Sequence, residues 1–291
     1  MSASALNPII ARMASQAVIR ALSAQIDSPW PQEEALFARY QDPTPERILD
    51  AGCGPGVGTY RLAELFPATQ VLGVDRIDAH LELARLHYSH LQPRVTFQHE
   101  DLGDLRMPGE TFDLTVCRHV QLSSLHVPDV LRELIRVTRG GGHLHLVAED
   151  YGVICFNAPK LREFWRTVAE IFGWNTDTDV YGRRLVSILT TLRMKAITLD
   201  YLVVDPNRSM REKMIETFEE WRDSLGEAIC SQISLTRQSV QDFFVDIIAE
   251  INDPRQHVLW LVPVISAEVR KIGVSPSPRF ETPAAGDSNV R

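Results

Sequence analysis

The sequence contains no long apolar run. None of its apolar segments approaches the roughly 20 residues that a membrane-spanning helix needs. The N-terminal stretch MSASALNPIIARMASQ also lacks the charged segment and the clean apolar stretch that mark a secretory signal. We therefore expect a cytoplasmic protein without a membrane partner.

Cysteine is scarce. The 291 residues include only four cysteines, Cys53, Cys117, Cys155 and Cys230, and no two of them form a C-x-x-C pair. Cysteines scattered in this way suggest neither a disulfide framework nor a zinc site. We expect no bound metal and a reducing compartment.

The chain also lacks an excess of positive charge. It carries 30 Lys and Arg against 38 Asp and Glu, which gives a net charge of -8 and a pI near 5.6. Residues 205–255 alone contain eleven acidic and six basic residues. Because Lys and Arg neutralisation of phosphates dominates nucleic-acid affinity, we expect no nucleic-acid partner.

The remaining composition is that of a globular protein. Hydrophobic residues make up 44% of the chain and charged residues 23%, which are ordinary values for a soluble domain. A chain of this length can bury one full core and carry an additional element.

Short apolar runs alternate with helical patterns in the first half of the chain. This alternation predicts right-handed βαβ units and a mainly parallel sheet with helices on both faces. The predicted strands are 48–50, 70–75, 95–99, 114–117 and 143–148, and the predicted helices between them are 59–66, 79–90 and 129–137.

Outside this region the regular alternation of short strands and helices ends. Helices are predicted over 8–26, 158–172, 182–194 and 208–252, and a further short helix is predicted to end at Tyr40. Strands are predicted over 196–204 and 257–265. Pro263 within the last strand indicates an edge strand or a bulge. The stripe of Met214, Phe218 and Trp221 is interpreted as core or lid packing, and the proline-rich end from Ser275 as a disordered tail.

These patterns divide the chain into four parts. They are an N-terminal helical lid over 1–45, a core over 46–204 and 256–272, a helical cap insertion over 205–255, and a disordered tail over 273–291.

The stretch ILDAGCGPGVGTY, residues 48–60, places four glycines between a predicted strand and a predicted helix. In an open parallel sheet, ligands bind at the carboxyl ends of the strands, where the first strand turns into the first helix. Glycines there let backbone N–H groups approach a ligand closely, and the helix N-terminus adds partial positive charge. Either a pyrophosphate or the carboxylate of an amino-acid-like ligand fits this arrangement.

The spacing favours the amino acid. A nicotinamide fingerprint needs glycine at the sixth position counted from Gly52, where this chain has Val57. Asp50 would repel a pyrophosphate but could accept hydrogen bonds from an ammonium group. Asp75 ends the second strand, 23 residues after Gly52, where a carboxylate can accept bonds from both ribose hydroxyls. Methionine joined to adenosine satisfies both ends.

ILDAGCGPG, VLGVD, FQHEDLGDL, FDLTVCRHV and ELIRVTRGGG follow one another in this order. Over residues 46–150 the chain thereby resembles the Rossmann-like, class I S-adenosylmethionine-dependent methyltransferases that act on small molecules. The resemblance implies a seven-stranded, mostly parallel sheet with an antiparallel final strand. It also implies S-adenosylmethionine as the cofactor.

By motif position, the resemblance also implies which residues surround the cofactor. They are Gly52 and Gly54 at the methionine part, Asp75 at the ribose, Arg76, Ile77, Asp101 and Leu102 at the adenine, and Arg118 near the methionine end. A His-Leu pair that the family often carries beyond this arginine is replaced by Ser123-Ser124-Leu125, followed by His126. The sequence therefore does not indicate whether a histidine of that loop faces the acceptor.

The acceptor side is less marked. His119 is the candidate general base, and one of Glu149, Asp150 and Tyr151 is a candidate substrate contact. A sulfonium methyl is already activated, so a base is needed only when the acceptor must lose a proton. We expect residues 1–40 and 205–255 to fold over the strand ends as a lid.

The sequence therefore predicts in-line methyl transfer to a small organic acceptor, an oxygen or nitrogen nucleophile. The acidic lid segment and the missing Asn/Asp-Pro-Pro-aromatic motif disfavour a nucleic-acid acceptor. A non-catalytic member that keeps the cofactor pocket is the main alternative, and a nicotinamide oxidoreductase is a weaker one. Monomer and homodimer both remain open.

Overall fold

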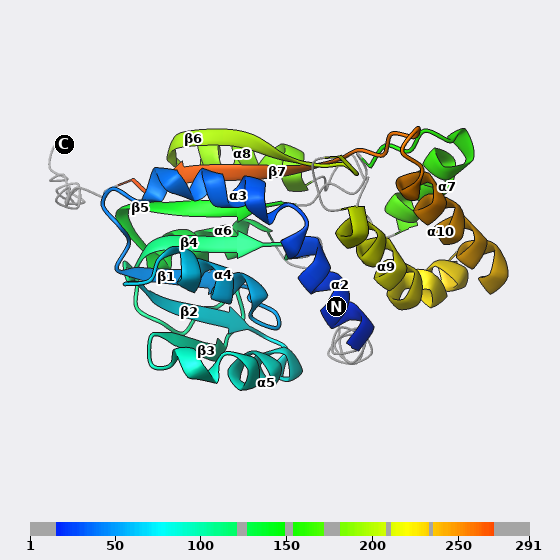
Figure 1. Cartoon of the computed structure of the whole chain (residues 1–291). Helices are drawn as coiled ribbons and strands as arrows, with labels where there is room; N and C mark the ends of the chain where they lie inside the picture. The colour runs from blue at the N-terminus through cyan, green and yellow to red at the C-terminus, as the bar shows by residue number, and fades with distance from the viewer. Residues whose placement is uncertain are drawn as a thin grey trace, which may run out of the picture.

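A computed structural model describes residues 16–120, 127–148, 154–171, 181–207, 211–232 and 235–270. Its centre is a seven-stranded sheet with the order β3-β2-β1-β4-β5-β7-β6 (Figure 1). This sheet confirms the predicted Rossmann-like fold class. The strands are β1 (Arg47–Ala51), β2 (Gln70–Asp75), β3 (Val95–His99), β4 (Phe112–Arg118), β5 (Thr138–Val147), β6 (Lys195–Val204) and β7 (Trp260–Glu268).

Strands β1 to β5 are parallel, and β7 runs antiparallel to both of its neighbours. Strand β1 lies between β2 and β4, so that Ile48 is in register with Val71 and with Leu114. Every residue of β4 is buried. A central parallel strand covered on both faces is mostly apolar, which explains the short apolar runs of the sequence.

Helices cover both faces of the sheet. Helices α6 (Val127–Val137) and α8 (Tyr181–Thr191) pack on the face that carries Leu49. The opposite face, which carries Ile48, is covered by α3 (Trp30–Leu36), the 3-10 turn η1 (Phe37–Tyr40), α4 (Val57–Leu65) and α5 (Asp78–His87).

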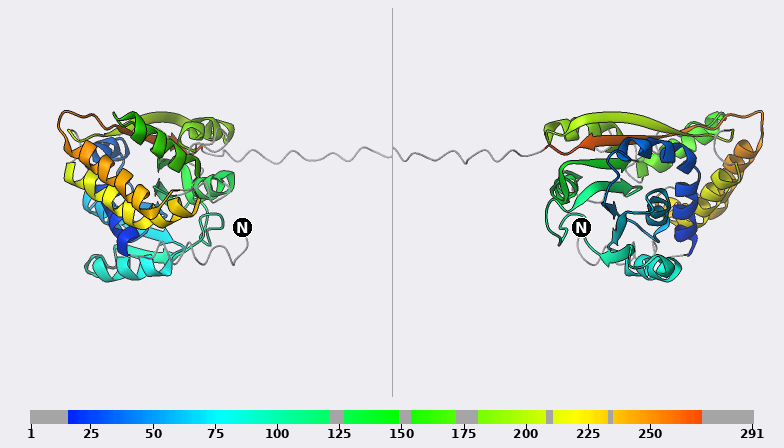
Figure 2. Two further views of the ribbon diagram at one scale, coloured as in Figure 1. Left: turned by 90° about the vertical axis from the view of Figure 1, so that its right-hand side faces the viewer. Right: turned by 60° about the vertical axis from the view of Figure 1, so that its left-hand side comes forward.

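A separate helical layer lies beyond the carboxyl ends of the parallel strands (Figures 1 and 2). It contains α7 (Pro159–Ile171), α9 (Arg211–Gln232) and α10 (Arg237–Asn252), which share one buried cluster. Met214, Phe218 and Trp221 lie inside this cluster, where Trp221 stacks on Trp165 of α7 at 5.6 Å. The apolar stripe of α9 is therefore core packing, and α7 belongs to the same layer.

Helix α2 (Gln16–Asp27) connects this layer to the sheet. It lies beside α9, and the guanidinium of Arg20 bonds Glu220 at 2.5 Å. Among the described residues, no helix is both long enough and apolar enough to cross a membrane. The predicted helix over 8–26 is described from residue 16 onward, and the tail lies outside the described residues.

Two sequence-based expectations about local structure are wrong. The helix predicted over 79–90 ends at His87, and a 3-10 turn, η2 (Ser89–Leu91), follows it. Pro263 lies inside β7 at neither an edge nor a bulge. Its carbonyl accepts the N–H of Ala148 (3.0 Å), just beyond the last ladder pair of β5 and β7. The missing proline N–H therefore falls where that ladder has ended.

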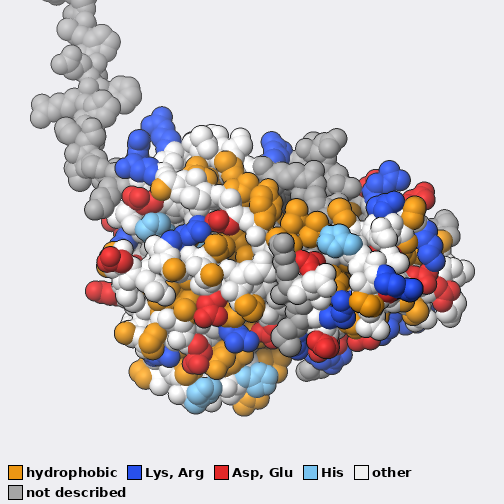
Figure 3. All heavy atoms as spheres, turned by 45° about the horizontal axis from the view of Figure 1, so that its top comes forward, with side chains coloured by type: hydrophobic (Ala, Val, Ile, Leu, Met, Phe, Trp, Pro, Cys, Tyr) orange, Lys and Arg blue, Asp and Glu red, His pale blue; other side chains and the backbone are white. Residues whose placement is uncertain are grey.

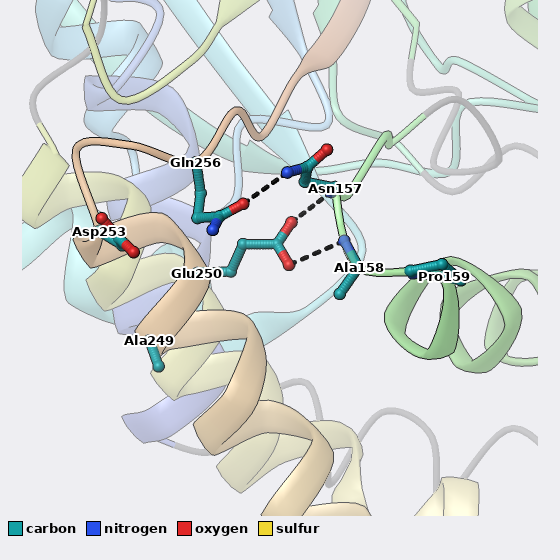
Figure 4. Close-up of a pocket in the computed structure, with 7 residues that line it drawn as sticks. All are labelled: Asn157, Ala158, Pro159, Ala249, Glu250, Asp253 and Gln256. Atoms are coloured by element: carbon teal, nitrogen blue, oxygen red, sulfur yellow. Dashed lines mark hydrogen bonds between the residues drawn. The ribbon is translucent and has the colours of Figure 1, made fainter.

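A cavity of about 500 Å³ lies in the helical layer, between α10 and the start of α7 (Figure 4). The buried carboxylate of Glu250 accepts the backbone N–H groups of Asn157 and Ala158 there. These N–H groups precede the first turn of α7, so Glu250 of α10 connects two helices that are far apart in the sequence. None of the residues implied to bind the cofactor lines this cavity.

The variant Glu250→Ala is expected to lower the free energy of unfolding by about 2 kcal/mol, because two buried N–H groups lose their acceptor. Urea denaturation measures this difference. The matched control is Asp246→Ala on the same helix, whose exposed ion pair with Lys160 (2.6 Å) is worth less than about 1 kcal/mol. Equal losses in the two variants would contradict this interpretation of Glu250.

Candidate active site

The glycine-rich loop follows β1 and adopts a conformation that requires glycine. Gly52, Gly54 and Gly56 have φ values of +79°, +53° and +87°, a region that side chains make costly. The N–H groups of Gly52 and Cys53 both donate to the carbonyl of Val74, at 2.8 and 2.9 Å. The loop is thereby held against the end of β2.

Close packing reinforces this requirement. A Cβ atom on Gly52 would lie 2.3 Å from Cγ2 of Val120, and one on Gly56 would lie 2.9 Å from Cβ of Ala84. Leu102 also reaches Gly52, since its Cδ1 would lie 3.7 Å from the same added Cβ. The loop, the end of β4 and the turn after β3 therefore meet at one edge of the sheet.

Asp75 joins this loop to the second strand. Its Oδ2 accepts the N–H of Gly54 at 2.8 Å, and its Oδ1 accepts the N–H of Ile77 at 2.9 Å. The side chain is partly exposed, and each carboxylate oxygen can accept a further hydrogen bond. Arg76 is partly exposed and Ile77 is buried in the turn that follows.

Asp50 lies beneath the loop. It is only 2% exposed, and its Oδ2 accepts the hydroxyl hydrogen of Thr59 at 2.6 Å. Burial raises the pKa of Asp50, and the nearby Arg118 guanidinium opposes that rise. A buried carboxylate in this state gains from any cation placed beside it.

Arg118 ends β4 and is buried by a helix from the N-terminal segment. Its Nη1 lies 3.2 Å from Oε1 of Glu33, and its guanidinium lies 5.4 Å from the ring centre of Trp30. Both partners belong to α3. The sequence did not reveal this contact, because Glu33 and Glu34 are identical neighbours and only packing decides that Glu33 is buried while Glu34 is exposed.

Glu33 also faces His145 of β5. Its Oε1 lies 3.3 Å from Nε2 of His145, and Nδ1 of that ring lies 3.1 Å from the hydroxyl of Tyr40. The Tyr40 hydroxyl in turn donates to Ser266 at 2.6 Å. Burial lowers the pKa of His145. Burial also opposes ionisation of Glu33, but Arg118 and His145 outweigh the effect of burial and lower the pKa of Glu33.

His119, the candidate base, follows Arg118 at the same edge. Its backbone is left-handed, with φ +52°, and its N–H donates to the carbonyl of Val147 at 3.2 Å. Its Nδ1 lies 3.4 Å from Nε2 of Gln25 on α2. The N-terminal helices therefore contact two consecutive residues of this edge.

The turn after β3 is more open. Asp101 is exposed, and its Oδ1 accepts the N–H of Gly103 at 2.9 Å, whereas Leu102 is buried. The other acceptor-side candidates, 123–126 and 149–151, lie outside the described residues. Within the described part of the chain, no three His, Cys, Asp or Glu side chains are grouped as metal ligands would be.

Comparisons with known proteins find similarity over the part of the chain that carries these residues. Residues 48–142 match the family model described as a methyltransferase domain. The chain therefore contains a methyltransferase domain of the Rossmann-like, S-adenosylmethionine-dependent family. The domain includes the glycine loop, Asp75 and Arg118.

Curated relatives of this methyltransferase domain match parts of the chain. An arsenite methyltransferase from Aquipseudomonas alcaligenes is 36% identical over 108 residues, 34% of this chain and 31% of the relative. A demethylmenaquinone methyltransferase from Deinococcus radiodurans is 30% identical over 128 residues, 44% of this chain and 52% of the relative. These matches span about half or less of each relative's own length.

A solved structure supports the fold of the methyltransferase domain. The phosphoethanolamine N-methyltransferase 2 of Haemonchus contortus, in complex with S-adenosyl-L-methionine, aligns with a TM-score of 0.52 and 17% identity. The alignment covers 83% of this chain and 53% of that one. At this identity the likeness concerns the fold alone.

The buried His145 predicts a pH-dependent stability. Because its folded pKa is lowered, the unfolded chain takes up the proton first as the pH falls below about 6.5. Stability is then lost toward acid pH by up to about 1.4 kcal/mol per pH unit. Glu33, whose pKa is also lowered, contributes stability that is lost only at more acidic pH, as the pH falls through its folded pKa.

Denaturation between pH 7.5 and 5.5 tests the contribution of His145. The variant His145→Gln is expected to show a flatter dependence than the natural chain, while the exposed His90→Gln keeps the original slope. If His145→Gln keeps the original slope, the neutral buried state assigned to His145 is wrong.

Proposed function

We propose that the protein transfers the methyl group of S-adenosylmethionine to a small organic acceptor, an oxygen or nitrogen nucleophile. One observation carries this proposal. The carboxylate of Asp75 binds the glycine loop through Gly54 and leaves acceptor capacity at the edge where that loop ends. A ribose would lie at Asp75, and an aminoacyl tail would lie along the glycine loop.

The residues at this edge fit such a cofactor. Asp75 would accept the ribose hydroxyls, Gly52 and Gly54 would line the methionine part, and Asp50 would face its ammonium group. The adenine would be bordered by Arg76, Ile77, Asp101 and Leu102. When bound, S-adenosylmethionine would supply a sulfonium methyl group that is already activated for displacement.

The protein's own contribution is then positional. Holding a nucleophile about 3 Å from the methyl carbon in a site without water provides most of the acceleration. Helix α2 lies over this edge through Gln25 and His119, and we assign it, with the layer of α9, to the lid. His119 would take a proton from an acceptor that must lose one.

A small acceptor is supported by charge. The segment 205–255 contains eleven acidic and six basic residues, and acidic and basic side chains are interspersed over the face in Figure 3. Such a surface gives little attraction to a polyphosphate. The printed names of the relatives refer to arsenite and demethylmenaquinone, so they leave the acceptor of this chain open.

The cysteines support a reducing compartment, and we place the protein in the cytoplasm. In the described part of the chain, none of Cys53, Cys117, Cys155 and Cys230 forms a disulfide, and burial raises the pKa of the Cys53 and Cys117 thiols. Inert buried thiols of this kind are typical of intracellular proteins.

The first test removes the carboxylate of Asp75. The variant Asp75→Ala is expected to weaken S-adenosylhomocysteine binding by at least about tenfold, because ribose acceptors and the anchor of Gly54 are lost together. Asp75→Asn, which keeps one acceptor oxygen, should lose less. Isothermal titration calorimetry measures both, with Glu82→Ala, which removes an exposed carboxylate of α5, as the control for charge.

Binding titrations and an assay of methyl transfer separate the alternatives. Binding of NADH in place of both adenosyl compounds would favour a nicotinamide oxidoreductase. Cofactor binding without transfer to any member of a panel of phenols, amines and carboxylic acids would favour a non-catalytic member. Unchanged binding in Asp75→Ala would contradict the proposed site.

The second test concerns His119. For an acceptor that must lose a proton, His119→Asn is expected to lower kcat by about 100-fold while leaving cofactor affinity unchanged. Steady-state rates of the natural enzyme and the variant, with cofactor affinity measured beside them, show the effect. A variant that retains the full rate would exclude His119 as the base.

A further inference from the structure

The sheet of the described residues ends at β6, whose outer edge carries exposed hydrophobic side chains. Strand β7 is the single neighbour of β6, and β6 forms the upper rim of the sheet in Figure 1, the side that is turned forward in Figure 3. Leu199 and Tyr201 of this strand are 44% and 54% exposed. The other exposed large hydrophobic side chains of the described residues are Leu86 and Val245. A hydrophobic edge strand is a surface to which another strand can add.

The hydrogen bonds of Val203 show which backbone groups of β6 face away from β7. Val203 donates its N–H to Oε1 of Gln32 at 3.0 Å, and its carbonyl accepts Nε2 of the same side chain at 2.8 Å. Because inward and outward groups alternate along an antiparallel strand, the N–H and C=O groups of Leu199 and Tyr201 also point outward. These groups make no hydrogen bond to another described residue.

The free part of this edge is short, because both of its ends are blocked. At one end the amide of Gln32, a residue of α3, occupies the place that a neighbouring strand would take beside Val203. At the other end the register with β7 shifts between Lys195 and Thr198, and Ala196 has a left-handed backbone with φ +45°. A bulge of this kind bends the strand and ends regular pairing. A partner strand therefore finds free pairing groups only between these two blocks.

We propose that this edge pairs with the same edge of a second copy of the chain. The two strands would run antiparallel about a two-fold axis, with Leu199 of each copy opposite Tyr201 of the other. This register pairs every free N–H and C=O group of both residues in both copies. A two-fold axis lets both copies use the same patch, as in most homodimers. The proposal does not depend on the proposed function.

The two blocks favour a second copy over an extended peptide. A long strand that ran along the whole of β6 would collide with the side chain of Gln32. In the proposed register, the residue opposite Val203 is Ile197 of the other copy, which lies in the bulge where that strand leaves the regular ladder. Each copy thus leaves the pairing at the point where the other copy is blocked.

The side chains on the two faces of the strand suit this register. On one face, Leu199 and Tyr201 would form two cross-strand pairs of an aliphatic with an aromatic side chain, which are favourable. On the other face, the Asp200 residues of the two copies would lie opposite each other. Each Asp200 already bonds Nη1 of Arg39 at 2.8 Å, and Nε and Nη2 of Arg39 bond no described residue. These nitrogens are available to the arriving carboxylate, so two guanidinium groups can offset the repulsion between the two carboxylates.

Analytical ultracentrifugation of the full chain tests the association. Pairing over so few residues buries less than the roughly 1,200 Å² of a standard interface, so we expect a dimer with a Kd on the order of tens of micromolar. Leu199→Lys should raise this Kd at least about tenfold, because a lysine on an edge strand opposes pairing. The matched controls, Leu86→Lys on α5 and Val245→Lys on α10, remove exposed hydrophobic side chains elsewhere and should leave the Kd unchanged.

Two results would overturn the proposed interface. One is a natural chain that stays monomeric up to about 500 µM, well above the expected Kd. The other is a loss of association in Leu86→Lys or Val245→Lys as large as in Leu199→Lys, which would indicate general hydrophobic contact.

A disulfide tests the register. The chain carries Cys155→Ser and Cys230→Ser, which remove the thiols that are not buried. In the proposed register the Cα atoms of residue 200 in the two copies lie about 4.5 Å apart, within reach of a disulfide. Asp200→Cys should therefore form a covalent dimer under mild oxidation, as seen on a non-reducing gel. Tyr201→Cys, whose new thiols are offset by two residues, should remain monomeric, and equal cross-linking of the two variants would contradict the register.

Discussion

The candidate site depends on the hydrogen bonds that the carboxylate of Asp75 accepts. This carboxylate connects the glycine loop after β1 with the turn after β2 by bonding one N–H group from each. The loop has three left-handed residues in close succession and could not hold its shape through side chains of its own. Asp75 lies at the carboxyl ends of adjacent parallel strands, where ligands bind in such sheets. The same carboxylate can therefore hold the loop in place and contact a ligand.

A second constraint lies behind this edge, where ionisable groups are taken out of water. Glu33, Arg118 and His145 are buried where α3 packs on the sheet, and Asp50 is buried beneath the glycine loop. A buried ion pair contributes little net stability, since desolvation offsets the attraction. Its effect is on orientation, because Glu33 of α3 lies 3.2 Å from Arg118 and 3.3 Å from His145. The same contacts bring the N-terminal segment to the cofactor edge.

The helical layer is assembled from distant segments. Helix α7 precedes β6, whereas α9 and α10 follow it, and the aromatic cluster around Trp165 and Trp221 joins them. Glu250 of α10 also connects this layer, because it accepts the backbone N–H groups of Asn157 and Ala158 just before α7. Helix α2 then lies beside α9, so the N-terminal segment and the segment before β7 both contribute to the region beyond the strand ends. A cover of this kind can exclude water from a reaction at that edge.

Much of this protein followed from local pattern. The alternation of apolar runs and helices predicted the parallel sheet, because period and turn residues are properties of short segments. The order of Asp50, Gly52, Gly54 and Asp75 predicted where a ligand would bind, since all four belong to one βαβ unit. The apolar stripe of α9 was likewise interpreted as packing, and the structure buries it.

Other features depended on residues far apart in the sequence. Nothing near Pro263 indicates that the ladder with β5 ends beside it, and nothing in α3 distinguishes Glu33 from Glu34. Arg118 was expected near the methionine end, but its partners Trp30 and Glu33 precede it by more than 80 residues. Sequence patterns thus determined the sheet and the glycine loop, which arise from near neighbours. Only tertiary packing decided which charges are buried, because desolvation depends on everything that surrounds a side chain.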